Sequence, residues 1–151
     1  MSADAYHLTA ASLEGPVTAM RTALADAGLE PEAIDYINAH GTGTLANDAN
    51  EARAIQEVFG DTIGRLAVSS TKSMHGHTIG AAGAVEAAAT VLAIHHQVLP
   101  PTLNSAPLDP ERELDVVPDR ARQATIRAAL SNSFAFGGLN AVLVFRQVLG
   151  S

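Results

Sequence analysis

Apolar residues recur at helical spacing in two stretches of the first sixty residues. Between positions 16 and 28 they lie three or four residues apart, and Gly28 is a suitable C-terminal stop for a helix. A second amphipathic pattern begins near Asp48 and stops at Gly60. Because Asp48 stands three residues before Glu51, the spacing of a capping box, we expect these two residues to cap the second helix.

Four short runs of β-forming residues accompany these helices. They cover residues 35–39, 65–69, 126–133 and 140–147. Pro100-Pro101 opens an aperiodic stretch that predicts a loop as far as about Arg120. The order of helices and strands predicts an α/β fold, and we treat residues 1–151 as one domain.

The stretch from about Thr78 to His96 predicts a helix of a different kind. Alanine, glycine and aliphatic residues occupy every face of it, so we expect a buried helix that its neighbours approach closely. Glu86 is the lone acid in this helix, and a buried carboxylate needs a partner. Lys72 is the only lysine in the chain and therefore the only lysine that could pair with Glu86.

Composition narrows the classes of protein. A chain of 151 residues, 47% of them hydrophobic, is long enough for one core, and its formal net charge of -7 disfavours nucleic acid and anionic membranes as partners. We see no membrane-spanning run and no signal peptide, so we expect a cytoplasmic protein. The chain contains no cysteine, which excludes disulfides, cysteine-bound metal and a thiol nucleophile of its own.

Candidate chemistry gathers in three turns that are rich in small residues. His40 follows the strand at 35–39, and Lys72 and His77 follow the next strand. The third turn, at 132–138, ends in two glycines whose N–H groups could face a ligand or could simply close a hairpin. Because α/β folds bind ligands where strands end, we expect these turns to lie on one side of the sheet.

The same residues allow other interpretations. A metal site at His40 and His77 is disfavoured, because neither a helical histidine pair nor a set of carboxylate ligands flanks them. Ser69 and Lys72 match the Ser-x-x-Lys pattern of serine acyl-enzymes, which short sequences often match by chance. The remaining histidines are expected to be structural, and they are His7, His75, His95 and His96.

Three motifs together resemble the signatures of the β-ketoacyl-acyl carrier protein synthases. They read NAHGTGT at 38–44, SSTKSMHGH at 69–77 with GAAGAVE at 80–86, and NSFAFGG at 132–138. They occur in the family's order and at its spacing. With PPTLN at 100–104, the chain is most similar to elongating type II synthases of fatty acid and polyketide pathways. The likeness covers nearly the whole chain but only the C-terminal half of a synthase.

The resemblance implies a thiolase-like fold, in which two similar α/β halves with mixed sheets enclose a pair of buried central helices. The Ala-rich helix would be one of these central helices. In the family, the N-terminal half supplies the nucleophilic cysteine. A partner half or a cysteine-bearing partner chain is therefore implied, together with an acyl carrier protein and a dimer of complete synthase units.

The resemblance also assigns roles to site residues. His40 and His77 would promote decarboxylation of malonyl-carrier protein and donate hydrogen bonds to the enolate oxygen. Lys72 would fix His77, and Glu86 would neutralise Lys72. Phe134 would supply one backbone donor to a second oxyanion, at the acyl-cysteine, and its ring would act as a gate.

Further residues are assigned to substrate binding. Thr42 and Thr44 match positions that hydrogen-bond the phosphopantetheine arm, and Phe136 and Gly137 belong to the same set. No metal and no cofactor is implied, because the substrates arrive on the phosphopantetheine of the carrier protein. The reaction would be a decarboxylative Claisen condensation of malonyl-carrier protein with an acyl thioester, and we expect the chain alone to be inactive because it lacks the nucleophile.

Three positions depart from the family's pattern. Ala135 stands where glycine is common, and we expect its methyl group to restrict a gating turn. Leu139 replaces a threonine and removes a hydroxyl near the site. Asn47 replaces a glycine before Asp48, a change that we expect to be tolerated.

Three functions remain open. The chain can be the C-terminal portion of a condensing enzyme, a non-catalytic scaffold or chain-length-factor-like subunit, or a stand-alone hydrolase or decarboxylase that uses Ser69 or the histidines. The retained histidines and lysine favour the first. A helix apolar on all faces predicts obligate association with a partner. Docking of an acidic carrier protein would need the partner half or a basic cluster of Arg120, Arg122 and Arg127.

Overall fold

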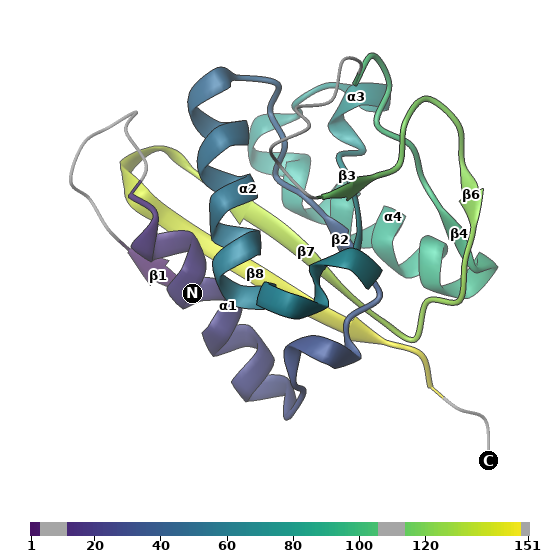
Figure 1. Cartoon of the computed structure of the whole chain (residues 1–151). Coiled ribbons are helices and arrows are strands. Elements are labelled where there is room, and N and C mark those ends of the chain that lie inside the picture. Colours follow the sequence, from purple (N-terminus) through teal and green to yellow (C-terminus); the bar gives the residue numbers. More distant parts are fainter. Residues whose placement is uncertain (4–11, 106–113, 149–151) are drawn as a thin grey trace.

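A six-stranded mixed sheet forms the centre of the molecule (Figure 1). The computed structural model describes residues 1–3, 12–105 and 114–148. The strands of this sheet are β1 (Ser2–Ala3), β2 (Tyr36–Asn38), β3 (Ala67–Ser69), β5 (Asp115–Val116), β7 (Ala128–Phe134) and β8 (Leu139–Arg146). Their order across the sheet is β1-β8-β7-β2-β3-β5. Four neighbouring strands, from β7 to β5, run parallel, whereas β8 is antiparallel to both β7 and β1.

Helices cover both faces of the sheet. α1 (Glu14–Ala27) and α2 (Leu45–Phe59) pack on one face, and α4 (Ala82–His96) packs on the other (Figure 1). The short helices are η1 (Pro31–Ala33), η2 (Gly60–Arg65), α3 (Lys72–His75), η3 (Ile79–Ala81) and η4 (Phe136–Gly138). Each face has its own core, and Met20, Ile55 and Leu130 are buried in the core beneath α1 and α2. The predicted α/β fold with a mixed sheet is confirmed.

The strand and helix predictions hold with small shifts at the ends. All four predicted strands exist, as β2, β3, β7 and β8. The glycine stop of α1 is also confirmed. Gly28 adopts a left-handed conformation with φ 63°, and its N–H donates to carbonyls of the last helical turn.

The capping-box prediction for α2 is wrong. The helix begins at Leu45, and its cap is Thr44, whose hydroxyl accepts a hydrogen bond from the Asn47 N–H at 3.3 Å. Glu51 does not fold back to cap the helix. Its carboxylate is instead buried beneath the His40 turn and accepts hydrogen bonds from four N–H groups. These bonds offset the cost of burying the charge, and a cap at an exposed helix end would offer fewer donors.

The Ala-rich helix is buried on one side only in this chain, in keeping with the expectation that it needs a partner to cover its other side. One stripe of α4, including Glu86, Thr90 and Ala93, packs on the sheet, whereas Val91 and Leu92 are exposed. The physical reason is that a single sheet contacts only one face of a helix. Among the described residues, 79–96 form one helical stretch apolar enough to cross a membrane, with a mean hydropathy of 1.2 over 18 residues, which corrects our reading that no such run exists. This composition is also that of a core helix in a soluble protein.

The predicted loop between residues 100 and 120 is partly structured. Within it, β5 extends the main sheet next to β3, and Thr102 forms a β-bridge with Pro118. On either side of it, β4 (Val98–Leu99) pairs antiparallel with β6 (Arg122–Gln123). Residues 106–113 of this predicted loop lie outside the described residues. These strands were not predicted because two-residue strands carry no periodic signal.

Candidate active site

Three turns of the chain meet at one edge of the sheet. β2, β3 and β7 are parallel, so their carboxyl ends lie side by side, and these ends lead to His40, to Lys72 and to Phe134. Two hydrogen bonds tie the first two turns together. Ala39 N–H donates to the Ser69 carbonyl at 2.8 Å, and the Ser70 hydroxyl donates to the Gly41 carbonyl at 2.7 Å. The predicted gathering of the turns is confirmed.

Gly41 lies where these two turns approach most closely. Its φ is +38°, and a Cβ atom there would stand 2.4 Å from the Cβ atom of Ser70. Gly43 has a φ of +76° but has no neighbour within 4 Å of a Cβ position. Of these two glycines, only Gly41 therefore combines a strained backbone conformation with a steric block.

We expect Gly41→Ala to lower the free energy of unfolding by roughly 2–4 kcal/mol, because overpacking and backbone strain add. The matched control is Gly43→Ala, which carries only the backbone strain and should cost about 1 kcal/mol. Urea unfolding of the two variants and the parent chain measures both values. If both variants lose the same amount of unfolding free energy, the Ser70 side chain moves aside at no cost and the predicted steric block is absent.

His40 and His77 form an edge-to-face pair. Their ring centroids are 5.5 Å apart at an interplanar angle of 86°, and the ring of Phe134 lies 5.9 Å from the ring of His40. His40 is 8% exposed and its Nδ1 atom has no hydrogen-bond partner in the described part of the chain. His77 is exposed. The pair thus presents one buried ring and one accessible ring.

The environment of His40 keeps its ring neutral. Burial lowers the pKa of His40, and the positive charge of Lys72 and the neighbouring His77 lower it further, to about 3. A neutral imidazole carries one N–H donor and one acceptor nitrogen. His40 is therefore suited to donating a hydrogen bond to an oxyanion at neutral pH.

This shift predicts a pH dependence of stability. In the unfolded chain His40 takes up a proton near pH 6.5, whereas in the folded chain it stays neutral. Since the unfolded state then binds more protons, this contribution to stability is complete above pH 6.5 and falls as the pH is lowered, by up to about 1.4 kcal/mol per pH unit. Two-dimensional ¹H–¹⁵N NMR of the imidazole nitrogens should show a neutral His40 down to about pH 4. An imidazolium signal from folded His40 at pH 6 would contradict the shift.

The protonation pattern of His77 follows from one backbone contact. The Ile79 N–H lies 3.2 Å from the Nδ1 atom of His77. Because a backbone N–H can only donate, Nδ1 must be the acceptor, and the proton of the neutral ring resides on Nε2. His77 therefore presents an Nε2–H donor.

Lys72 and Glu86 form the predicted ion pair. The Lys72 Nζ atom bonds to Glu86 Oε1, and the exposed fractions of the two residues are 6% and 0%. The second carboxylate oxygen of Glu86 has no hydrogen-bond partner among the described residues. The pair joins the turn that follows β3 to the buried stripe of α4.

Glu51 is a site residue that we did not predict as one. Its carboxylate accepts hydrogen bonds from the backbone N–H groups of His40 (2.9 Å) and Gly41 (2.8 Å), and from the side-chain amides of Asn132 and Asn47. Burial raises the pKa of Glu51, and the four donors partly offset that effect. Glu51 therefore holds the His40 turn against β7. The sequence does contain a signal for this role, because Glu51 is an acid on the buried face of an amphipathic helix. We assigned Glu51 to a capping box because it lies three residues after Asp48.

The expected substrate-binding residues lie at the periphery. The hydroxyls of Thr42 and Thr44 are 3.1 Å apart, and Thr44 also caps α2. Phe136 is 78% exposed in the hairpin turn, where Gly137 has a φ of +76°. The turn is thus a hairpin, one of the two outcomes left open.

The three departures from the family's pattern fit their surroundings. Ala135 has a φ of -108° and a ψ of 162°, an extended conformation that any residue adopts, so its methyl group adds no backbone strain there. Leu139 is exposed next to this turn. Asn47 bonds to Asp48 and Glu51, in keeping with its expected tolerance.

The alternative chemistries find little support in the geometry. Ser69 is 1% exposed, and its hydroxyl lies 2.9 Å from the hydroxyl of Tyr36, whose pKa burial holds above its usual value. Lys72 is engaged by Glu86 and not by Ser69. Within the described ranges no group of three or more His, Asp or Glu side chains is arranged to hold a metal ion.

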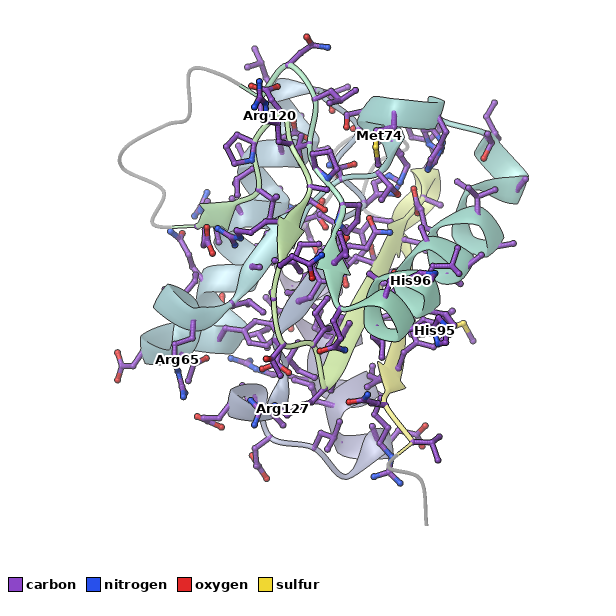
Figure 2. The ribbon with its side chains drawn as sticks, turned by 90° about the vertical axis from the view of Figure 1, so that its right-hand side faces the viewer. Arg65, Met74, His95, His96, Arg120 and Arg127 are labelled. Carbon is purple, nitrogen blue, oxygen red and sulfur yellow. The ribbon has the colours of Figure 1, made fainter. Side chains whose placement is uncertain are left out.

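Three other histidines lie within the described residues. The ring nitrogens of His75 face the Gly76 carbonyl (2.8 Å) and the Thr71 hydroxyl (3.2 Å). His95 and His96 lie at the C-terminal end of α4, away from Met74 of α3 (Figure 2). His7 lies outside the described residues.

The arginines named for carrier-protein docking do not form a basic cluster. Arg122 is paired with Asp115 at 2.5 Å and Arg127 with Asp35 at 2.8 Å. Figure 2 shows Arg120 and Arg127 at opposite ends of the face that it displays. The acidic partners and this separation leave no concentrated positive patch there.

A cleft of about 680 Å³ opens beside the turns that carry His40 and Lys72. Lys72 and His77 contribute to its wall together with Thr42. The segment from Thr102 to Ser105 also lines it and is hydrogen-bonded to the turn that carries Lys72. His40 is not part of the lining. The cleft is large enough to hold an extended ligand beside the exposed ring of His77.

Comparison with known proteins is consistent with this geometry. Residues 1–106 match the family model described as beta-ketoacyl synthase, C-terminal domain. The chain is 56% identical over 148 residues to nodulation protein E of Rhizobium meliloti, covering 98% of this chain and 37% of that protein. It is 53% identical over 150 residues to a 3-oxoacyl-acyl-carrier-protein synthase 2 of Coxiella burnetii, covering 98% of this chain and 36% of that protein.

Solved structures give the same result. The ishigamide ketosynthase/chain length factor matches with a TM-score of 0.92 and 49% identity, over 97% of this chain and 36% of that one. A beta-ketoacyl synthase from Burkholderia phymatum matches with a TM-score of 0.91 and 41% identity over the same shares. A type II polyketide synthase acyl-carrier protein in complex with its ketosynthase matches with a TM-score of 0.91 and 38% identity, also over 97% and 36%. The chain thus spans little more than a third of the length of these relatives.

Proposed function

The chain belongs to the beta-ketoacyl synthase family, and we propose that it is the C-terminal portion of a condensing enzyme that joins a malonyl group to an acyl thioester. Its fold is the thiolase-like α/β fold of the ketosynthases, and its relatives include elongating type II synthases. The single observation that carries the proposal is the His40/His77 pair beside the buried Lys72–Glu86 ion pair. In this proposal, the neutral ring of His40 and the Nε2–H donor of His77 would each donate a hydrogen bond to the same oxygen.

The proposed chemistry uses these donors at the moment when charge develops. Cleavage of the bond between the malonyl carboxylate and the α-carbon releases CO₂ and leaves its electron pair in an enolate. His40 and His77 hydrogen-bond the thioester oxygen that gains this negative charge, which lowers the barrier. The α-carbon then attacks the acyl group on a cysteine thioester, the new C–C bond forms, and the cysteine leaves as a thiolate.

The nucleophile must come from elsewhere in the synthase. This chain contains no cysteine and spans about 37% of the length of the curated relatives that it matches. We propose that the missing half supplies the cysteine and covers the exposed stripe of α4, where Val91 and Leu92 are uncovered. The chain alone would then be inactive, and the complete synthase would be a dimer of such units in the cytoplasm.

The remaining assignments follow the same proposal. The backbone N–H of Phe134 would stabilise the oxyanion at the acyl-cysteine, with its ring against His40 as the gate. Thr42, Thr44, Phe136 and Gly137 would contact the phosphopantetheine arm of an acyl carrier protein. We propose that the carrier protein docks mainly on the missing half, because Arg122 and Arg127 are already paired with aspartates.

The experiment that tests the proposal is native mass spectrometry of the chain from its own source, followed by a decarboxylation assay. A stoichiometric partner segment whose cysteine becomes acylated, and which with this chain releases CO₂ from malonyl-carrier protein, is the expected result. A chain that is monomeric and soluble at micromolar concentration, with no such segment, would overturn the proposal and favour a scaffold role.

A further inference from the structure

One buried carboxamide connects the three segments that carry His40, Lys72 and Glu86. Asn38 ends β2 and is fully buried. Its Nδ2 group lies 3.2 Å from the Thr71 hydroxyl, 3.3 Å from the Glu86 carbonyl and 3.3 Å from the Thr90 hydroxyl. Its Oδ1 atom accepts from the N–H and the hydroxyl of Thr71, both at 3.3 Å. One side chain thus joins β2, the turn after β3 and α4.

Each partner of Asn38 is next to a functional group. Asn38 stands two residues before His40, and Thr71 immediately precedes Lys72. Glu86 carries the carboxylate that pairs with Lys72, and the Thr90 hydroxyl donates to the Glu86 carbonyl at 2.8 Å. A change at this junction would therefore move Lys72 and Glu86 relative to the strand that leads to His40.

The ion pair itself has few other restraints. In the described part of the chain, Lys72 Nζ bonds to Glu86 Oε1, while Glu86 Oε2 has no partner. Such a pair fixes the separation of two atoms but leaves the relative position of their backbones undetermined. The amide of Asn38 supplies that restraint, because it binds the backbone on both sides of the pair at once.

We propose that Asn38 is a positioning residue, whose carboxamide, with Thr90, holds the Lys72–Glu86 pair in register with His40. The effect of Asn38 on catalysis rests on the proposed function. The restraint that Asn38 places on Lys72 is a property of this chain and does not depend on that function. Removing the amide loosens the turn after β3, so that Lys72 leaves its buried position more often.

The sole lysine of the chain makes this restraint measurable. Reductive methylation with formaldehyde and cyanoborohydride modifies accessible amines, and Lys72 is the only side chain that can react. Proteolysis at arginine and mass spectrometry separate Lys72 from the N-terminal amine. Because Lys72 is buried, its rate of modification reports how often the turn opens. We expect Asn38→Ala and Thr90→Val to raise this rate about tenfold, the effect of losing one or two buried hydrogen bonds.

Two controls separate local opening from general instability. Thr90→Ser keeps the hydroxyl and should stay within twofold of the parent rate, since both hydrogen bonds persist. Leu24→Ala lies in the core beneath α1 and destabilises the chain without touching the Asn38 junction. Rates are compared in urea at equal fractions of unfolded protein. If Asn38→Ala and Leu24→Ala then react equally fast, or if Lys72 stays as protected as in the parent, the proposal is wrong.

A second measurement uses the assembled synthase. Thr90→Val should lower kcat for CO₂ release about tenfold and leave KM for malonyl-carrier protein unchanged, and Thr90→Ser should restore kcat. Equal loss in both variants would contradict positioning by the hydroxyl. If the parent synthase releases no CO₂ at all, the proposed function fails, while the lysine-modification rates still decide whether Asn38 restrains the turn.

Discussion

Replacing His40 with alanine in the assembled synthase should lower kcat for malonyl decarboxylation by about 10²–10³-fold, the usual effect of removing one oxyanion donor. His40 is 8% exposed and its ring is neutral, so the hydrogen bond that we propose to the developing enolate would act where water is largely excluded. In such a site a donor stabilises charge far more than it does in water. Release of ¹⁴CO₂ from labelled malonyl-carrier protein measures the effect.

Matched variants distinguish loss of the donor from loss of packing. His40→Gln fills most of the same volume and offers an N–H donor, so we expect it to recover part of the activity. His95→Ala removes an exposed histidine at the far end of α4 and should leave the rate unchanged. Full activity in His40→Ala together with loss in Ser69→Ala would instead favour a serine-dependent hydrolase. Transfer of the acyl group to the partner's cysteine should survive in His40→Ala, since that step does not use the enolate donors.

The location of this site could be predicted from the sequence because a simple rule governs parallel strands. His40, Lys72 and the turn at Phe134 each follow a β-prone run, and parallel strands end at the same edge. The pairing of Lys72 with Glu86 could be predicted for a similar reason. A buried acid on an apolar helix needs a cation, and the chain has one lysine.

Glu51 and Asn38 could not be predicted as site residues because their partners are distant in the sequence. Glu51 bonds to Asn132, which is 81 positions away, and Asn38 bonds to Thr90, which is 52 positions away. The local spacing of Asp48 and Glu51 fitted a capping box equally well, and the alternative depends on tertiary packing. Buried amides and carboxylates of this kind show no periodicity, so the sequence alone does not separate them from surface polar residues.

The exposure of α4 shows a different limit. Because this helix is apolar on all faces, the sequence predicts that it is buried. The stripe that includes Glu86 and Thr90 is indeed buried. The faces with Val91 and Leu92 are exposed in this chain. A helix is apolar on each face that packs against another element in the complete assembly. The single sheet of this chain covers only one of those faces. The uncovered stripe therefore supports a partner at this face.

Lys72→Met should lower the free energy of unfolding by about 3–5 kcal/mol, the usual result of leaving one member of a buried ion pair without its partner. Glu86 is fully buried, and one of its carboxylate oxygens already has no hydrogen-bond partner among the described residues, so loss of Lys72 would remove its compensating charge. Urea unfolding of the complete chain at pH 7 measures the change. Because the two side chains are shielded from solvent, salt should alter it little.

The double variant Lys72→Met/Glu86→Leu tests whether the ion pair contributes to the stability of the fold or to the rate of decarboxylation. Replacing both charges with apolar groups of similar size should recover most of the stability lost in Lys72→Met, since the desolvation penalty of both ions disappears together. The decarboxylation rate should not recover, because the positive charge of Lys72 that acts on His40 is then missing. A double variant as unstable as Lys72→Met would show that packing, not charge, causes the loss. A double variant with the parent's rate of CO₂ release would show that Lys72 has no part in the chemistry.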